Sequence, residues 1–130
     1  MRGAVCAGSA AMITLVVVAA RQLGVVKRLP DPPGEMWDSD GIVMSKAAYP
    51  GGIPDGVLGV ASYGVTLGLL LLAEDAEWLR PVAKAKLAMD AAAAAANAVR
   101  QVVVFGRVCS WCMATVACTA AMAGLGRRQL

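Results

Sequence analysis

The sequence contains no histidine, and only 5% of its residues are aromatic and 16% are charged. Without histidine, metal sites with imidazole ligands, haem ligation through histidine and Ser-His-Asp catalysis are excluded. Neither a Walker-type Gly-Lys-Ser/Thr nor a Gly-x-Gly-x-x-Gly occurs, which argues against a nucleotide site. The formal net charge of +3 is spread along the chain rather than clustered, so the sequence predicts no nucleic-acid partner.

Long apolar stretches are abundant. Hydrophobic residues make up 58% of the chain, whereas soluble domains contain about 45–50%. Charged residues are absent from residues 3–20, 56–73 and 108–126. Each stretch is long enough to cross about 30 Å of hydrocarbon as a helix. We therefore predict an integral, multi-pass membrane protein in contact with lipid rather than an ordinary soluble enzyme.

The predicted fold is an all-α membrane protein with a single domain over residues 1–130. The four transmembrane helices of the bundle are expected at about residues 3–26, 55–73, 78–106 and 108–126. The long loop 27–54 and a short helix within it are expected to cap one end. Two alternatives stay open: the first span as a cleaved signal peptide, and the charged third span as an amphipathic helix at the membrane surface.

Local patterns support this division. The loop region 27–55 holds five of the six prolines and five of the nine acidic residues. The sequence Asp38-Ser39-Asp40 is expected to cap a short helix through about Tyr49, which Pro50-Gly51-Gly52 ends. In the third span, Lys86 and Asp90 are four residues apart and can pair on one helical face.

Four cysteines are present, and two of them form the motif Cys109-Ser110-Trp111-Cys112 at the predicted start of the fourth helix. Sulfurs three residues apart on a first helical turn can close a small disulfide ring, and the helix dipole stabilises a thiolate there. The alternative is a pair of buried, inert cysteines. Cys6 and Cys118 are interpreted as small packing residues, and no metal site is predicted.

Several residues, taken in order and spacing, resemble the vitamin K epoxide reductase family. They are Ser45, Gly52-Ile53-Pro54, Gly59, Tyr63, Phe105 and the motif Cys109-Ser110-Trp111-Cys112. The similarity extends over about residues 31–119. It implies a four-helix bundle around a quinone pocket, covered by the loop.

The resemblance also implies chemistry. Cys112 would face the quinone and form the adduct or charge-transfer contact, while Cys109 would exchange disulfides. The quinone, of ubiquinone or menaquinone type, would be a substrate, and the thiol partner would be a thioredoxin-like dithiol protein. Residues expected to bind the quinone or to help cap its pocket are Ser45, Asp55, Leu58, Tyr63 and Trp111.

This chain departs from the family pattern at four positions. The two loop cysteines of the family should fall at Asp31 and Ser39, so the internal cysteine shuttle is missing. Asp55 stands where some relatives have a quinone-bonding Asn, and Val116 stands where some have Tyr. A separate dithiol protein would then attack Cys109 directly. The competing hypothesis is a non-catalytic membrane subunit or interaction module that keeps the fold.

Three of the candidate residues have simpler interpretations that stay open. Asp55 could be an exposed carboxylate that caps the second helix, and Ser45 could bond only to nearby backbone. Trp111 could anchor the chain at the membrane interface instead of packing on a quinone. Six cationic residues fall toward each side of the membrane, so charge does not assign the orientation. By resemblance, we expect a bacterial inner membrane with Cys109 and Cys112 toward the exported side.

Overall fold

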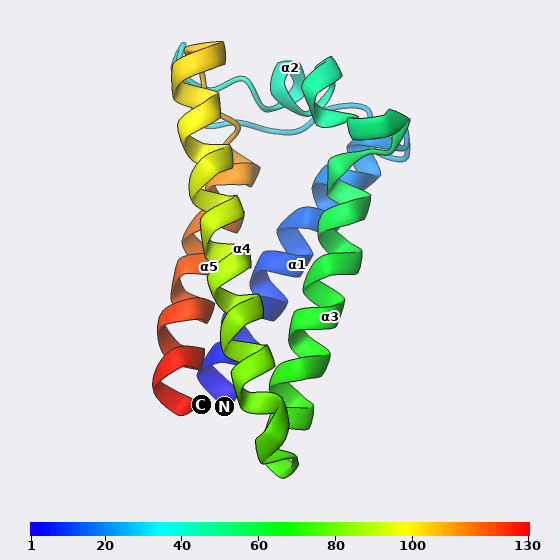
Figure 1. Ribbon diagram of the computed structural model, residues 1–130. Helices are drawn as coiled ribbons and strands as arrows, with labels where there is room; N and C mark the ends of the chain where they lie inside the picture. Colours follow the sequence, from blue (N-terminus) through cyan, green and yellow to red (C-terminus); the bar gives the residue numbers. More distant parts are fainter.

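The computed structural model describes residues 1–130, and its regular structure is helical, with no strand (Figure 1). The long helices are α1 (Arg2–Gln22), α3 (Asp55–Asp75), α4 (Arg80–Arg100) and α5 (Ser110–Gln129). A short helix, α2 (Ser39–Val43), lies in the segment between α1 and α3. Both termini lie at the same end of the bundle, and α2 lies at the other (Figure 1).

Three helical segments are long and apolar enough to cross a membrane: α1, α3 and residues 77–105, which contain α4. The multi-pass membrane character predicted from the sequence is therefore supported. The charged third span meets this criterion, whereas α5 is not among the three. A fourth crossing by α5 stays a prediction.

The helix ends differ from the prediction in ways that the backbone explains. Helix α1 stops at Gln22 rather than 26 because Gly24 adopts a φ of +81°, a left-handed conformation that glycine tolerates. The third predicted helix is a 3₁₀ turn (Glu77–Leu79), then α4, then a wider π-helical turn (Gln101–Phe105). Helix α5 continues to Gln129.

The short helix in the loop is also shorter than predicted. Asp38 caps α2 as expected, since its carboxylate accepts a hydrogen bond from the Gly41 amide at 3.1 Å. However, α2 ends at Val43, and two separate 3₁₀ turns follow at Lys46–Ala48 and Pro50–Gly52. The predicted continuous helix through Tyr49 is therefore wrong.

Helix α1 packs against both α3 and α5, and α4 packs against α5 and α3. Small residues permit the closest approach: a Cβ atom on Gly56 would lie 2.8 Å from the Ala19 backbone nitrogen. The core of the bundle contains Ala4, Ala11, Tyr63, Leu70, Leu87 and Met122. Tight contacts of this kind hold the four helices in one fixed arrangement.

Two charged residues of α4 are directed into the bundle. Lys86 and Asp90 form the predicted ion pair, and the Asp90 side chain is only 5% exposed. Thr66 of α3 donates to Asp90 and accepts from Lys86 Nζ at 2.7 Å. The pair therefore joins α4 to α3, and the partly polar third helix packs on its neighbour through these side chains.

The segment between α1 and α3 lies at the end of the bundle where α5 begins (Figure 1). Two backbone hydrogen bonds join it to the residue before Cys109: Asp38 N to Val108 O, 2.9 Å, and Val108 N to Met36 O, 2.8 Å. Leu29, Ile42 and Val43 of this segment are buried in one cluster with Cys109.

Candidate redox site

Cys109 and Cys112 are joined in a disulfide, with their Cα atoms 5.1 Å apart. Cys109 immediately precedes α5, and its sulfur accepts a hydrogen bond from the Cys112 amide at 3.1 Å. The predicted ring on the first turn of the helix is thus present. The two sulfurs differ in environment, because Cys109 has no exposed surface and Cys112 is partly exposed.

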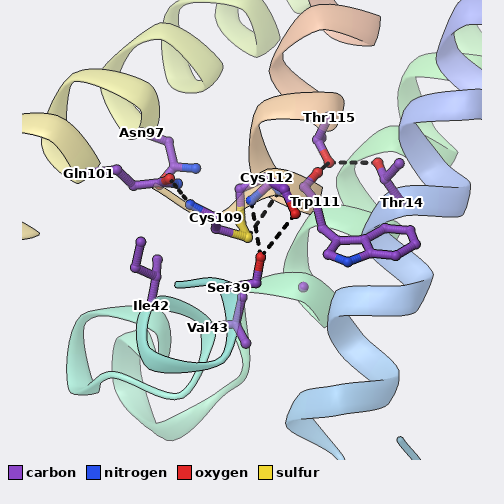
Figure 2. The surroundings of a disulfide bond; sticks show 12 residues. Thr14, Ser39, Ile42, Val43, Asn97, Gln101, Cys109, Trp111, Cys112 and Thr115 are labelled. Atoms are coloured by element: carbon purple, nitrogen blue, oxygen red, sulfur yellow. Dashed lines mark hydrogen bonds between the residues drawn. A yellow bond between two sulfur atoms is a disulfide. The ribbon is translucent and has the colours of Figure 1, made fainter. Parts of the chain in front are cut away.

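The backbone of Cys109 is held in place by Gln101, which lies in the π-helical turn after α4. The Gln101 side chain has no exposed surface, and its Oε1 accepts a hydrogen bond from Cys109 N at 2.9 Å (Figure 2). A buried amide N–H without a partner would be costly, so this bond stabilises the position of the first cysteine.

A polar network joins the loop to the same turn. Asp31 accepts hydrogen bonds from the Ser39 and Ser110 hydroxyls and from Ser39 N, the last at 2.9 Å. Ser39 Oγ in turn accepts a hydrogen bond from Ser110 N at 3.0 Å. Asp31 and Ser39 are the positions at which the resemblance placed the missing loop cysteines. They lie beside the cysteine motif, but their link to it is non-covalent.

This network sets the ionisation of Asp31. Partial burial acts to raise the pKa of Asp31, but hydrogen bonds from Ser110 and Ser39 outweigh it and hold the pKa below the usual 3.8. Asp31 is therefore an anion at neutral pH, and hydrogen bonds to an anionic acceptor are stronger than neutral ones.

A cavity of about 470 Å³ adjoins the second cysteine. All four long helices contribute to its wall, which is mainly apolar, and Cys112, Thr115 and Val116 line it from α5. Charged and amide side chains from the other helices also line it: Asp55 from α3, and Asn97 and Arg100 from α4. A mostly apolar cavity with a few polar groups is typical of a small-molecule site.

The model of the vitamin K epoxide reductase family matches residues 3–126 of this chain. The chain belongs to this family. Comparisons with curated proteins and with solved structures found no match. Family membership confirms the resemblance predicted from the sequence and indicates a membrane thiol oxidoreductase.

The structure brings only some of the predicted site residues of this family member together. Asp55, Tyr63 and Cys112 line one cavity. The other candidates lie outside its wall: Ser45 donates to the Ile42 carbonyl at 2.7 Å, and Leu58 is 42% exposed. Trp111 donates its indole N–H to the Pro30 carbonyl at 3.0 Å, which adds another bond between α5 and the loop.

Asp55 is better defined than the sequence suggested. It is half-buried, and its carboxylate accepts a hydrogen bond from Gln22 Nε2 at 2.8 Å. The same Gln22 also donates to the Val43 carbonyl and accepts from Gly56 N, so it joins α1, α2 and α3. The alternative of an exposed carboxylate that caps α3 is therefore wrong.

The remaining cysteines do not approach the pair. Cys118 packs against the bundle core, as predicted, whereas Cys6 is exposed on α1, so its interpretation as a packing residue is wrong. Tyr63 lines the cavity, but its hydroxyl hydrogen-bonds with Thr119.

Sequence reasoning missed the roles of Gln22, Gln101, Asn97 and Arg100. Asn97 and Arg100 were noted only as polar residues of the third span, although their spacing of three places them on one face of a helix. That face would have been a usable signal. The contacts of Gln22 and Gln101 depend on packing between elements, and no local pattern indicates them.

Proposed function

We propose that this protein is a membrane oxidoreductase that couples its Cys109/Cys112 pair to a quinone substrate and supports disulfide formation in a separate thioredoxin-like protein. The observation that carries the proposal is the placement of Cys112. Cys112, one half of a helix-start disulfide, lines a cavity that is mainly apolar and carries some polar groups, which suits a quinone ring and its carbonyl oxygens.

The proposed cycle has two balanced steps. In the first, the two thiols give two electrons and two protons to the quinone, which becomes the hydroquinone while Cys109 and Cys112 form the disulfide. In the second, a thiolate of the partner attacks Cys109, a mixed disulfide forms, and the second partner thiol resolves it. The partner leaves as a disulfide, and both cysteines are thiols again.

The burial of Cys109 places a condition on the second step. Its sulfur has no exposed surface, and Leu29, Ile42 and Val43 of the loop pack around it. The partner therefore reaches Cys109 only after this part of the loop moves away. No loop cysteine is present to pass the disulfide from Cys109 to the partner. The loop movement therefore gives the partner direct access to Cys109 instead.

The proposal includes the membrane arrangement. All four long helices cross the bilayer as one domain, and residues 27–54 cap the end that carries the cysteine pair. That end faces the exported side of a bacterial inner membrane, where disulfides persist. The antiparallel order of the helices and the shared end of both termini support an even number of crossings (Figure 1).

The test is mass-shift alkylation in membranes, with Cys6 and Cys118 replaced by alanine so that only the pair reports. Reduced Cys109 and Cys112 should become protected as a disulfide when ubiquinone-1 is added, and should stay reactive without it. The variant Cys109→Ser in the same background should show no protection. If the pair labels equally with and without quinone, the enzyme proposal fails, and the alternative of a non-catalytic membrane subunit stands.

A further inference from the structure

The cavity wall contains a cationic side chain, Arg100, and not all of its hydrogen-bond donors have a partner. Arg100 lines the cavity, and its Nη2 donates a hydrogen bond to Asn97 Oδ1 at 3.0 Å. Its Nε is buried and has no hydrogen-bond partner. A buried donor on a charged group is costly to leave unpaired, so its persistence requires an explanation.

No protein group satisfies this donor. Asp55 lines the same cavity as Arg100, yet no ion pair joins the two side chains. The Asp55 carboxylate is instead hydrogen-bonded to Gln22. Arg100 thus lines the cavity wall without a carboxylate partner, and Cys112 lines the same cavity from α5.

We propose that Arg100 binds the quinone head group, donating a guanidinium N–H to one carbonyl oxygen while Cys112 contacts the ring. This inference rests on the proposed function. When the two thiols pass two electrons to the quinone, negative charge develops on the carbonyl oxygens before the two protons arrive there. A permanent cation beside one oxygen stabilises that charge, because arginine stays protonated in proteins.

Asn97 is a positioning residue in this arrangement. Its amide oxygen accepts a hydrogen bond from Arg100 Nη2, which fixes the plane of the guanidinium. A simple anchor at the membrane interface would need only a long cationic side chain, and lysine would serve equally well. A carbonyl-binding role depends on the planar donor geometry of arginine.

The first measurement is the dissociation constant of ubiquinone-1 for the oxidised protein in lipid nanodiscs, where the disulfide prevents turnover. Arg100→Gln should weaken binding roughly 10- to 100-fold, as expected for the loss of a hydrogen bond from a charged group. The control is Arg28→Gln, which removes the same charge from an exposed loop residue and should change the constant by less than about twofold.

Arg100→Lys is the second variant and keeps a cation if Arg100→Gln does not fold. If Arg100 is only an anchor, Arg100→Lys should bind ubiquinone-1 as tightly as the parent protein does. That result would overturn the proposal. So would parent-level binding by a folded Arg100→Gln, or the absence of ubiquinone-1 binding to the parent protein. Weakened binding in both variants supports it.

The second measurement is the rate at which ubiquinone-1 oxidises the reduced pair. Arg100→Gln should lower kcat by a larger factor than it raises KM, because the bond strengthens as charge develops on the oxygen. Equal oxidation by Arg100→Gln and Arg28→Gln overturns the inference and leaves the proposed function intact. Arg100-dependent binding without any oxidation of the parent's pair overturns the proposed function and leaves Arg100 as the carbonyl donor.

Discussion

At the scale of single residues, Asp31 and Ser39 stand out because they occupy the places of two expected cysteines. An anionic carboxylate and a hydroxyl there hold the loop against Ser110 by hydrogen bonds. A reversible polar contact occupies the place where the resemblance predicts a cysteine pair. The contact keeps the loop over Cys109 without any covalent bond.

Neutralising Asp31 should loosen this contact. In the reduced protein, Asp31→Asn should raise the alkylation rate of Cys109 about threefold to tenfold, since roughly 1 kcal/mol of charge-assisted bonding is lost at a partly exposed site. Glu35→Gln removes an exposed loop carboxylate and should leave the rate unchanged. An unchanged rate in Asp31→Asn would show that the apolar contacts alone hold the loop.

The depressed pKa of Asp31 also predicts a pH dependence. A carboxyl with a lower pKa in the folded state adds stability above its unfolded pKa of about 3.8, and this stability is lost as pH falls through the folded pKa. The unfolding temperature of the parent should therefore exceed that of Asp31→Asn at pH 6, with the difference shrinking below about pH 3.8. A difference that is constant with pH would contradict the assignment.

At the scale of elements, the cavity depends on how closely the helices approach one another. Gly56 lets α3 contact α1 directly, with the Ala19 backbone where a side chain would otherwise lie. Just beyond this contact, α1, α3, α4 and α5 all line the cavity. The Lys86–Asp90 pair fixes α4 against α3 further along the bundle.

Two glycine substitutions on α3 should therefore differ in their effect on stability. Gly56→Ala places a methyl group 2.8 Å from backbone and should destabilise the protein by about 1–3 kcal/mol. Gly68→Ala meets nothing within 4 Å and should be neutral or stabilise by up to about 1 kcal/mol through helix propensity. Chemical unfolding in detergent measures both, and equal effects would contradict the close contact between α1 and α3.

At the scale of the whole molecule, the two ends of the bundle differ in kind. One end carries the termini, and the other carries the loop (Figure 1). The cysteine pair lies at the start of α5, beside this loop. Four crossings would place these ends on opposite sides of the membrane, and Glu35 and Gln129 are exposed residues that mark them.

Labelling from one side checks this arrangement. In a background with the four native cysteines replaced, a cysteine introduced by Glu35→Cys should react with an impermeant maleimide from the exported side of sealed vesicles. A cysteine introduced by Gln129→Cys should react only after permeabilisation. Reaction of both from the same side would show that α5 does not cross, and the four-span proposal would fail.

The sequence by itself determined what is local or periodic. Charge-free runs indicated membrane helices, a spacing of four paired Lys86 with Asp90, and Asp38 capped its helix. The cysteine motif at a helix start, with the ordered residues before it, indicated the family. Each of these features depends on residues that are close in the chain or repeat at the helical period, so tertiary packing was not needed to find them.

Only the tertiary structure decided which distant groups meet. It buried Cys109 under the loop, joined Asp31 to Ser110 and brought Asp55, Arg100 and Cys112 to one cavity. Those contacts depend on close helix packing, on where α1 ends and on the path of the loop. Because these set the position of side chains tens of residues apart, no pattern within one segment contains the information.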